Sequence, residues 1–230
     1  MKVNISNLIV EVTRKCNMTC DHCLRGEAQA VDIDFQYIDS VLSQTEYIGN
    51  VTFTGGEPSL NVKAIDYFLM IAKKLKVGIG GFYIATNGMT INEDFVMACL
   101  RLYSYSDEKK MCLVDISNDK YHANEGSYNT ELLDGLSFIH RKYEKERYDF
   151  GFNKFLIMEG RAKENFPDTG WKADKKRKIE SVEDFNDTEI YLNVHGEIIN
   201  GCDWSYKSQK KNKLCFVSGL KMFYETLTQE

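Results

Sequence analysis

The chain has 230 residues, of which 43% are hydrophobic and 27% charged, as is typical of one globular domain or one domain with a small appendage. Its formal net charge of −5 argues against general nucleic-acid binding, which favours a basic surface. No run of about 18 apolar residues predicts a membrane span, and Met1–Ile9 lacks the layout of a signal peptide. We therefore expect a cytoplasmic protein whose seven cysteines are free thiols or metal ligands rather than disulfides.

Six short runs rich in β-branched and aromatic residues predict strands, each bounded by turn residues. They cover residues 8–13, 51–54, 82–86, 112–117, 152–158 and 189–194. Apolar residues at helical spacing predict helices between the strands, around 35–42, 65–72, 95–102 and 132–143. Strands that alternate with helices indicate a parallel sheet with right-handed crossovers, either a partial barrel or an open doubly wound sheet.

Three cysteines follow the first predicted strand on one short segment, at Cys16, Cys20 and Cys23. Three thiolates this close together can bind one metal centre, and they leave one iron of a [4Fe–4S] cube open, whereas electron-transfer clusters use four cysteines. A zinc site built from these cysteines with His22 or a distant ligand is the alternative. Because His22 adjoins Cys23, both would chelate one zinc awkwardly, and we favour the iron–sulfur cluster.

Glycines and a carboxylate follow the second predicted strand, in Gly55-Gly56-Glu57-Pro58. Glycine has no Cβ, so Gly55 and Gly56 allow a sharp turn and a close approach to a ligand. Glu57 either faces the mouth of the sheet or caps the helix after Pro58, and both roles are compatible.

Polar residues also end the third and fourth predicted strands. Thr86-Asn87-Gly88 is a ligand-binding segment or simply a turn. Asp115 and Ser117 are two residues apart on a strand and therefore face the same side, as ligand contacts or as a satisfied polar pair. Ligands gather at the carboxyl ends of strands in barrels and in open α/β sheets, so these ends predict the site.

Together, these segments resemble the radical S-adenosylmethionine (SAM) superfamily. The CxxxCxxC loop, the Gly-Gly-Glu stretch and Thr86-Asn87-Gly88 are similar to its motifs and occur in the same order, within roughly residues 8–160. The resemblance implies an α/β fold, a (β/α)6 partial TIM-type barrel with a short C-terminal tail. We expect residues 1–200 to form this core and residues 201–230 to form a tail that packs on it.

The resemblance also implies a [4Fe–4S] cluster on the three cysteines and bound SAM. Gly55, Gly56 and Glu57 would hold the amino group of the SAM methionine, and Asn87 accompanies them. Asp115 and Ser117 would bind the ribose or the carboxylate of SAM. Peptide-modifying members often carry Gly-Arg-Ala where this chain has Gly160-Arg161-Ala162, which makes Arg161 a candidate for the SAM carboxylate, with a surface arginine as the alternative.

The implied reaction is reductive SAM cleavage to a 5′-deoxyadenosyl radical, which abstracts hydrogen from a peptide or protein. A flavodoxin or ferredoxin is the implied electron donor. Two alternatives stay open: a radical SAM enzyme acting on a nucleotide or other small metabolite, and a non-catalytic zinc-binding interaction module. Only Cys202 and Cys215 lie in the tail, too few for a second cluster, so we expect a single cluster.

Overall fold

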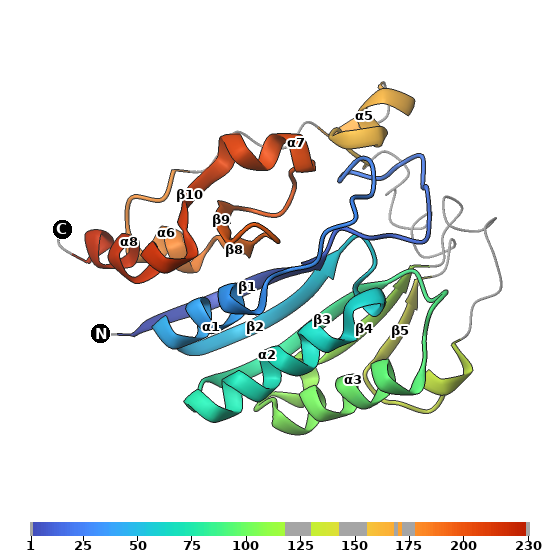
Figure 1. The fold of residues 1–230 in the computed structure, drawn as a ribbon, viewed down its shortest axis with the longest axis horizontal. Helices are drawn as coiled ribbons and strands as arrows, with labels where there is room; N and C mark the ends of the chain where they lie inside the picture. Colours follow the sequence, from blue (N-terminus) through green and yellow to red (C-terminus); the bar gives the residue numbers. More distant parts are fainter. Residues whose placement is uncertain (1, 118–129, 143–155, 168–169, 172–177, 229–230) are drawn as a thin grey trace.

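The structure is a computed structural model, and it describes residues 2–117, 130–142, 156–167, 170–171 and 178–228 (Figure 1). An eight-stranded sheet has the order β10-β9-β8-β1-β2-β3-β4-β5. Strands β8 and β1 to β5 pair in parallel, while β9 and β10 add antiparallel neighbours beyond β8. The strands are β1 Val3–Thr13, β2 Thr45–Gly55, β3 Gly78–Thr86, β4 Leu113–Ser117, β5 Ile139–Lys142, β8 Glu189–Leu192, β9 Glu197–Asn200 and β10 Lys213–Phe216.

One face of this sheet is covered by helices that share a single apolar core with it (Figure 1). The helices of this layer are α1 Phe35–Gln44, α2 Val62–Leu75, α3 Glu93–Tyr105, α6 Val182–Asn186 and α8 Leu220–Leu227. Two short helices, α5 Gly160–Asn165 and α7 Tyr206–Gln209, lie near the carboxyl end of β1 (Figure 1). The 3-10 turns are η1 Pro58–Asn61, η2 Lys109–Met111, η3 Glu131–Leu133, η5 Lys210–Asn212 and η6 Val217–Gly219.

The helical layer forms where the apolar spacing predicts it. Helix α2 buries Ile65, Phe68 and Ala72 on one stripe, as expected from the helical period. Phe68 meets Phe53 of β2 edge to face, with ring centroids 5.2 Å apart. Aromatic pairs favour this arrangement, which adds about 0.5–1.5 kcal/mol to the burial of both rings. The helix ends at Lys76, which adopts the left-handed conformation of a C-cap.

Alternation along the parallel strands separates an apolar face from a polar one. On β2, Val51 and Phe53 are fully buried against the helices, whereas Thr52 and Thr54 are half-buried on the opposite face. We call this second face of β1 to β5 the inner face. A parallel sheet covered on both sides has apolar residues on both faces, so the polar inner face indicates a surface for a ligand.

The predicted fold class is confirmed, but one predicted helix is wrong. Residues 132–143 do not form a helix: η3 is followed by strand β5, which pairs with β4 through Asp115 and His140. A short apolar run fits either period, and here pairing with the edge of β4 decides for the strand. In the described part of the strand predicted at 152–158, Leu156–Ile157 form β6, which pairs with β7, Gly170–Trp171, outside the large sheet; residues 152–155 lie outside the described residues.

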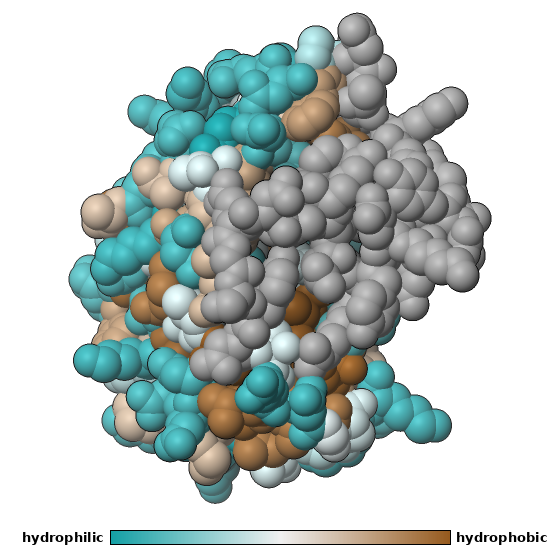
Figure 2. Space-filling model, turned by 90° about the vertical axis from the view of Figure 1, so that its right-hand side faces the viewer, coloured by the Kyte–Doolittle hydropathy of each residue, from teal (hydrophilic) through white to brown (hydrophobic). Residues whose placement is uncertain are grey.

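The sixth predicted strand is present as β8, and it lies beside β1 rather than beyond the fifth strand. Within the described residues, none of the helices combines the length and apolar character needed to span a bilayer. Figure 2 looks onto the end of the molecule where the parallel strands terminate, and hydrophilic side chains dominate the described surface in its upper part.

Candidate radical SAM site

The cysteine loop is the segment of residues 14–26 that follows β1. It carries Cys16, Cys20 and Cys23 as free, half-buried thiols, and the buried Met18 anchors it. Burial raises the pKa of the Cys16 thiol, opposed by a backbone hydrogen bond at Met18. Among the described residues, no three His, Cys, Asp or Glu side chains, the three loop cysteines included, form a group suited to a single metal ion. A cube differs from a single ion because each thiolate binds a different iron.

The two glycines at the end of β2 pack directly against the backbone where β1 runs into the cysteine loop. Gly56 N donates to Thr13 O at 2.9 Å, and Glu57 N donates to Lys15 O at 2.8 Å. A Cβ on Gly56 would stand 2.2 Å from Lys15 O, and one on Gly55 would stand 2.0 Å from Thr13 O. The close approach that the sequence predicts is therefore made to the loop that holds the cysteines.

The carboxylate of Glu57 is buried and accepts hydrogen bonds from three protein donors. Its Oε1 accepts hydrogen bonds from Ser59 N at 3.0 Å and from Thr86 Oγ1 at 2.7 Å, and its Oε2 accepts one from Asn87 N at 2.8 Å. Burial raises the pKa of Glu57, while these hydrogen bonds act in the opposite direction. The capping role expected of Glu57 is present, because Ser59 N lies in the first turn of η1. The same carboxylate joins the ends of β2 and β3.

Asn87 continues this chain of contacts to the cysteines. Its Nδ2 donates to Asn17 Oδ1 at 2.7 Å, inside the CxxxCxxC segment, and its Oδ1 accepts from Met89 N at 3.0 Å. Gly88 has a φ of 76°, a backbone conformation that favours glycine and allows the chain to turn after β3. Asn87 thus braces the cysteine loop with its own side chain.

Helix α5 contacts the cysteine loop from the other side. Arg161 N donates to Cys23 O at 2.9 Å. Gly160 adopts a φ of 54°, and a Cβ there would stand 2.6 Å from Cys23 O. The sequence motif Gly-Arg-Ala therefore places the start of α5 against the third cysteine.

The side chain of Arg161 is only 14% exposed, so it is not a surface arginine. Its Nη1 donates to Glu27 at 3.4 Å, while its Nε is buried without a hydrogen-bond partner among the described residues. The guanidinium lies close enough to act on Cys16, whose pKa it pulls downwards. A buried cationic donor without a partner beside three thiols suits an anionic ligand, so these residues fit an iron–sulfur cluster and the carboxylate of SAM.

Asp115 and His140 form a pair on the inner face, at matched positions of β4 and β5. The His140 Nδ1 and Asp115 Oδ1 atoms lie 3.0 Å apart, and Tyr83 OH donates to Asp115 Oδ2 at 2.6 Å. The Asp115 side chain is 3% exposed and that of His140 is 47% exposed, so the carboxylate anchors an accessible imidazole. Asp115 thus has polar partners on β3 and β5, while Ser117 lies half-buried at the end of the same strand.

The pair of Asp115 and His140 was not predicted from the sequence. The signal was present: on a strand, His140 falls opposite Asp115. It was hidden because residues 132–143 also match a helical period.

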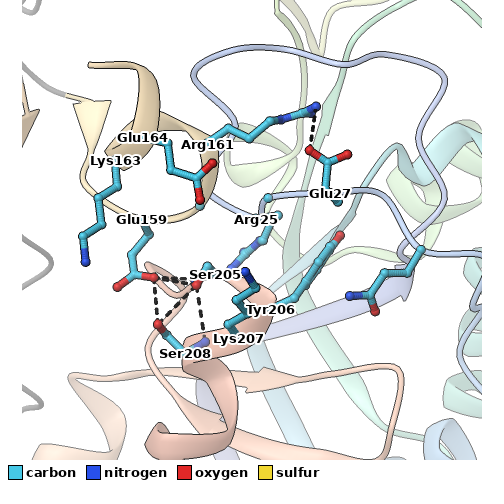
Figure 3. Close-up of a pocket in the computed structure, with 13 residues that line it drawn as sticks. Arg25, Glu27, Glu159, Arg161, Lys163, Glu164, Ser205, Tyr206, Lys207 and Ser208 are labelled. Atoms are coloured by element: carbon cyan, nitrogen blue, oxygen red, sulfur yellow. Dashed lines mark hydrogen bonds and ion pairs between the residues drawn. The ribbon is translucent and has the colours of Figure 1, made fainter. Parts of the chain in front are cut away.

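A pocket of about 460 Å³ opens beside the cysteine loop, between α5 and α7 (Figure 3). Glu159 links its walls by accepting hydrogen bonds from Ser205 Oγ at 2.6 Å and Ser208 Oγ at 2.8 Å. Arg25, a second residue missed from the sequence, donates through Nη1 to Cys202 O at 2.7 Å and to Trp204 O at 2.6 Å. The cysteine loop is therefore tied to the start of the C-terminal tail.

The remaining cysteines lie on other elements. Burial raises the pKa of Cys202 strongly, and its thiol contacts Asp203 at 3.5 Å. Cys215 lies on β10, where burial raises its pKa to about 11. Cys99 and Cys112 are buried in the apolar core, as their sequence context predicts.

Comparison with known proteins connects this arrangement to a family. Residues 10–105 match the model of the Radical SAM superfamily. The chain is 26% identical to a probable GTP 3′,8-cyclase of Pyrococcus horikoshii over 163 residues, 68% of this chain and 48% of that protein. It spans less than half of the length of the curated relatives that it matches.

Two solved structures share the fold. The structure of BtrN in complex with AdoMet and 2-DOIA has a TM-score of 0.59 and 17% identity, covering 99% of this chain and 88% of that one. The structure of anSMEcpe with bound AdoMet and Cp18Cys peptide has a TM-score of 0.61 and 13% identity, covering 99% and 81%. Members of the superfamily use a [4Fe–4S] cluster and SAM. Residues 10–105 are therefore similar to a radical SAM domain.

Proposed function

We propose that this chain is an enzyme that cleaves SAM reductively and directs the resulting radical to a peptide or protein side chain. One observation carries the proposal: Glu57, Asn87 and Arg161 come from three separate segments, and all three donate hydrogen bonds to the loop that bears Cys16, Cys20 and Cys23. Such convergence on three free thiols is expected of a loop that must hold a cluster with one open iron. When bound, the cluster supplies one electron to the sulfonium of SAM, which yields methionine and a 5′-deoxyadenosyl radical.

Different residues around the cysteine loop are assigned to different groups of SAM. The carboxylate of Glu57 is engaged by Ser59, Thr86 and Asn87, so it shapes the Gly55–Glu57 stretch, whose backbone remains to receive the amino group. The buried Nε of Arg161 is the donor available for the SAM carboxylate. Ser117, half-buried at the end of β4, is the hydroxyl that we assign to the ribose.

The inner face is the surface that we assign to the substrate. Asp115 orients the imidazole of His140 toward it, and Thr52 and Thr54 add half-buried hydroxyl groups. A fixed set of hydrogen-bonding groups positions a substrate close to a reactive centre. The peptide assignment rests on Gly160-Arg161-Ala162 and on the likeness to a structure that holds AdoMet and a peptide.

A nucleotide or other small metabolite is the second candidate substrate. It is favoured by the relative described as a probable GTP 3′,8-cyclase and by the likeness to BtrN, which was solved with AdoMet and 2-DOIA. Anaerobic assays separate the candidates: GTP should increase 5′-deoxyadenosine formation under this second proposal, and a short precursor peptide encoded beside the gene should do so under the first.

We further propose that residues 201–230 are a tail that completes the core of residues 1–200. Pairing of β10 with β9 and the bonds from Arg25 to Cys202 and Trp204 support this division. An oxygen-sensitive cluster on free thiols requires a reducing compartment, so we propose the cytoplasm, with a flavodoxin or ferredoxin as the electron donor.

Anaerobic reconstitution followed by reaction with SAM and dithionite tests the central proposal. We expect a brown protein with about four irons per chain, as one [4Fe–4S] cluster requires, and formation of 5′-deoxyadenosine. Alanine at Cys16, Cys20 or Cys23 should abolish both results, while Cys215→Ala, on a strand of the tail, should retain them. A colourless, zinc-loaded wild-type protein would refute the proposal and favour the interaction module.

A further inference from the structure

An arginine at each end of the cysteine loop binds the segment of residues 202–209, which we call the tail strap. Arg25 lies two residues after the third cysteine. It donates through Nη1 to Cys202 O at 2.7 Å and to Trp204 O at 2.6 Å. Its guanidinium carbon also stands 4.8 Å from the centroid of the Tyr191 ring. The loop thus holds the first residues of the strap from the side of its third cysteine.

Arg14, two residues before the first cysteine, binds the other end of the strap. It is 4% exposed, and its Nη2 donates to Gln209 Oε1 at 2.6 Å. Its guanidinium carbon stands 4.2 Å from the centroid of the Tyr206 ring, and its Nε donates to Glu11 Oε2 at 3.1 Å. Tyr206 N in turn donates to Arg25 O at 3.1 Å. Both ends of the segment that carries the three thiols therefore contact the strap.

The apolar core contributes little to the position of the strap. Among the described residues, no member of the strap belongs to the main apolar core, and its first residues pack on a small separate cluster. Ser205 and Ser208 bond to Glu159, which precedes α5 (Figure 3). Helix α5 itself rests on the cysteine loop, through the bond from Arg161 N to Cys23 O. The strap is therefore fixed chiefly by polar contacts to the loop and to α5.

The junction around Arg14 leaves polar atoms of the strap and of β1 unpaired. Three residues that contact Arg14 each have a buried atom without a hydrogen-bond partner within the described part of the chain: Glu11 Oε1, Tyr206 OH and Gln209 Nε2. A buried polar atom opposes its own burial unless a water or another group pairs with it. The closed arrangement of the strap is therefore finely balanced, and a change in the cysteine loop is enough to shift it.

We propose that cluster binding and closure of the tail strap are coupled through Arg14 and Arg25: the bound cluster fixes the cysteine loop, the loop fixes the strap, and the closed strap retains the cluster. This inference rests on the proposed function. Coupling between two equilibria is reciprocal, so each strengthens the other by the same factor. Because residues 205–208 line the pocket of about 460 Å³, that wall forms fully once the cluster is bound. Both arginines act as positioning residues, with no contact to the cluster required.

The test compares the wild-type full chain with Arg25→Lys, which keeps the charge but loses the fork that reaches two carbonyls. Hydrogen–deuterium exchange of residues 202–209 is followed by mass spectrometry under anaerobic conditions, before and after cluster reconstitution. In wild type, cluster binding should slow exchange of the strap by about fivefold or more, the lower end of typical coupling factors. In Arg25→Lys this protection should disappear, and a chelator should remove the cluster faster by about the same factor.

Arg101→Lys is the matched control. Arg101 also joins two elements, by donating to both carboxylate oxygens of Asp66, but it lies in the helical layer away from the cysteine loop. It should keep both the protection of the strap and the wild-type rate of cluster loss. A general loss of stability from replacing an arginine would affect both variants, whereas the coupling is lost in Arg25→Lys alone.

Equal exchange of the strap with and without the cluster in wild type overturns the inference, and so does wild-type cluster retention in Arg25→Lys. If circular dichroism shows that Arg25→Lys does not fold, Gln209→Ala decides by the same two measurements, because it removes the acceptor of Arg14 from the side of the strap. Unchanged exchange and cluster retention in that variant overturn the inference as well. Failure of the wild-type protein to assemble a cluster is a separate result, which refutes the proposed function.

Discussion

Removing the carboxylate of Glu57 should weaken the link between β2, β3 and the cysteine loop. Glu57→Ala deprives three buried donors of their acceptor: Ser59 N, Thr86 Oγ1 and Asn87 N. Glu57→Gln keeps the side-chain volume and one acceptor oxygen, but it places an amide donor where one of these N–H or O–H groups donates. The two substitutions therefore differ in how many donors they leave unpaired.

The structure sets the size of each effect. Each buried donor left without a partner costs about 1–3 kcal/mol, which gives a gross loss of at least about 3 kcal/mol for three donors in Glu57→Ala. Part of this is offset because burial of the carboxylate is itself unfavourable, as its raised pKa indicates. We expect a net loss of about 3 kcal/mol for Glu57→Ala and about 1–2 kcal/mol for Glu57→Gln in the free energy of unfolding.

Urea unfolding of the cluster-free protein, followed by circular dichroism, measures these differences. The reaction of the three loop cysteines with a thiol reagent should also become faster in both variants, because the loop loses its brace. Glu46→Gln, at an exposed position of β2, is the control and should stay within about 0.5 kcal/mol of wild type. Stabilities of both Glu57 variants within that same interval would refute the reasoning.

Three other substitutions probe the loop from different sides. Gly160→Ala should lower the free energy of unfolding by about 1–3 kcal/mol and reduce the cluster content, because φ is 54° and the new Cβ would clash with backbone oxygens. Gly219→Ala is the control: its Cβ would enter open space, so it should be neutral in the same unfolding and iron assays. The pKa of Asp32 is lowered in the folded protein: desolvation by burial raises it, but the hydrogen bond from Lys15 contributes to a net decrease. Asp32 should therefore stabilise the protein above about pH 3.9, the pKa of an aspartate in the unfolded chain. This stabilisation should be lost as the pH falls through the lower pKa of the folded state. Asp32→Asn should thus be less stable than wild type at pH 6, by under about 1 kcal/mol because the Lys15–Asp32 ion pair is exposed, and should equal wild type at pH 2. A difference in urea midpoint that stays constant between these pH values would contradict this prediction. Asn87→Ala breaks the bond to the cysteine loop and should cost about 1 kcal/mol and speed cluster loss to a chelator, so unchanged chelation kinetics would argue against the brace.

Much of the fold was readable from local patterns. Alternating and helical spacings identify β1 to β4 and α1 to α3, because burial on one face imposes a period that depends only on the element. The CxxxCxxC segment and the Gly-Gly-Glu stretch were readable for a similar reason. Both features involve residues that are neighbours in the sequence: three cysteines on one short loop, and two adjacent glycines that have no Cβ atoms.

What the tertiary structure alone decided depends on partners far apart in the chain. The sequence pattern at residues 132–143 fits a helix, but pairing with the edge of β4 makes residues 139–142 a strand. The same pairing brings His140 next to Asp115. The carboxylate of Glu57 accepts hydrogen bonds from Thr86 and Asn87 at the end of β3, and Arg25 joins a segment 177 residues away in sequence. Periodicity reports which face of an element is buried and cannot report which distant polar group lies opposite, because that follows from how the strands are ordered and paired.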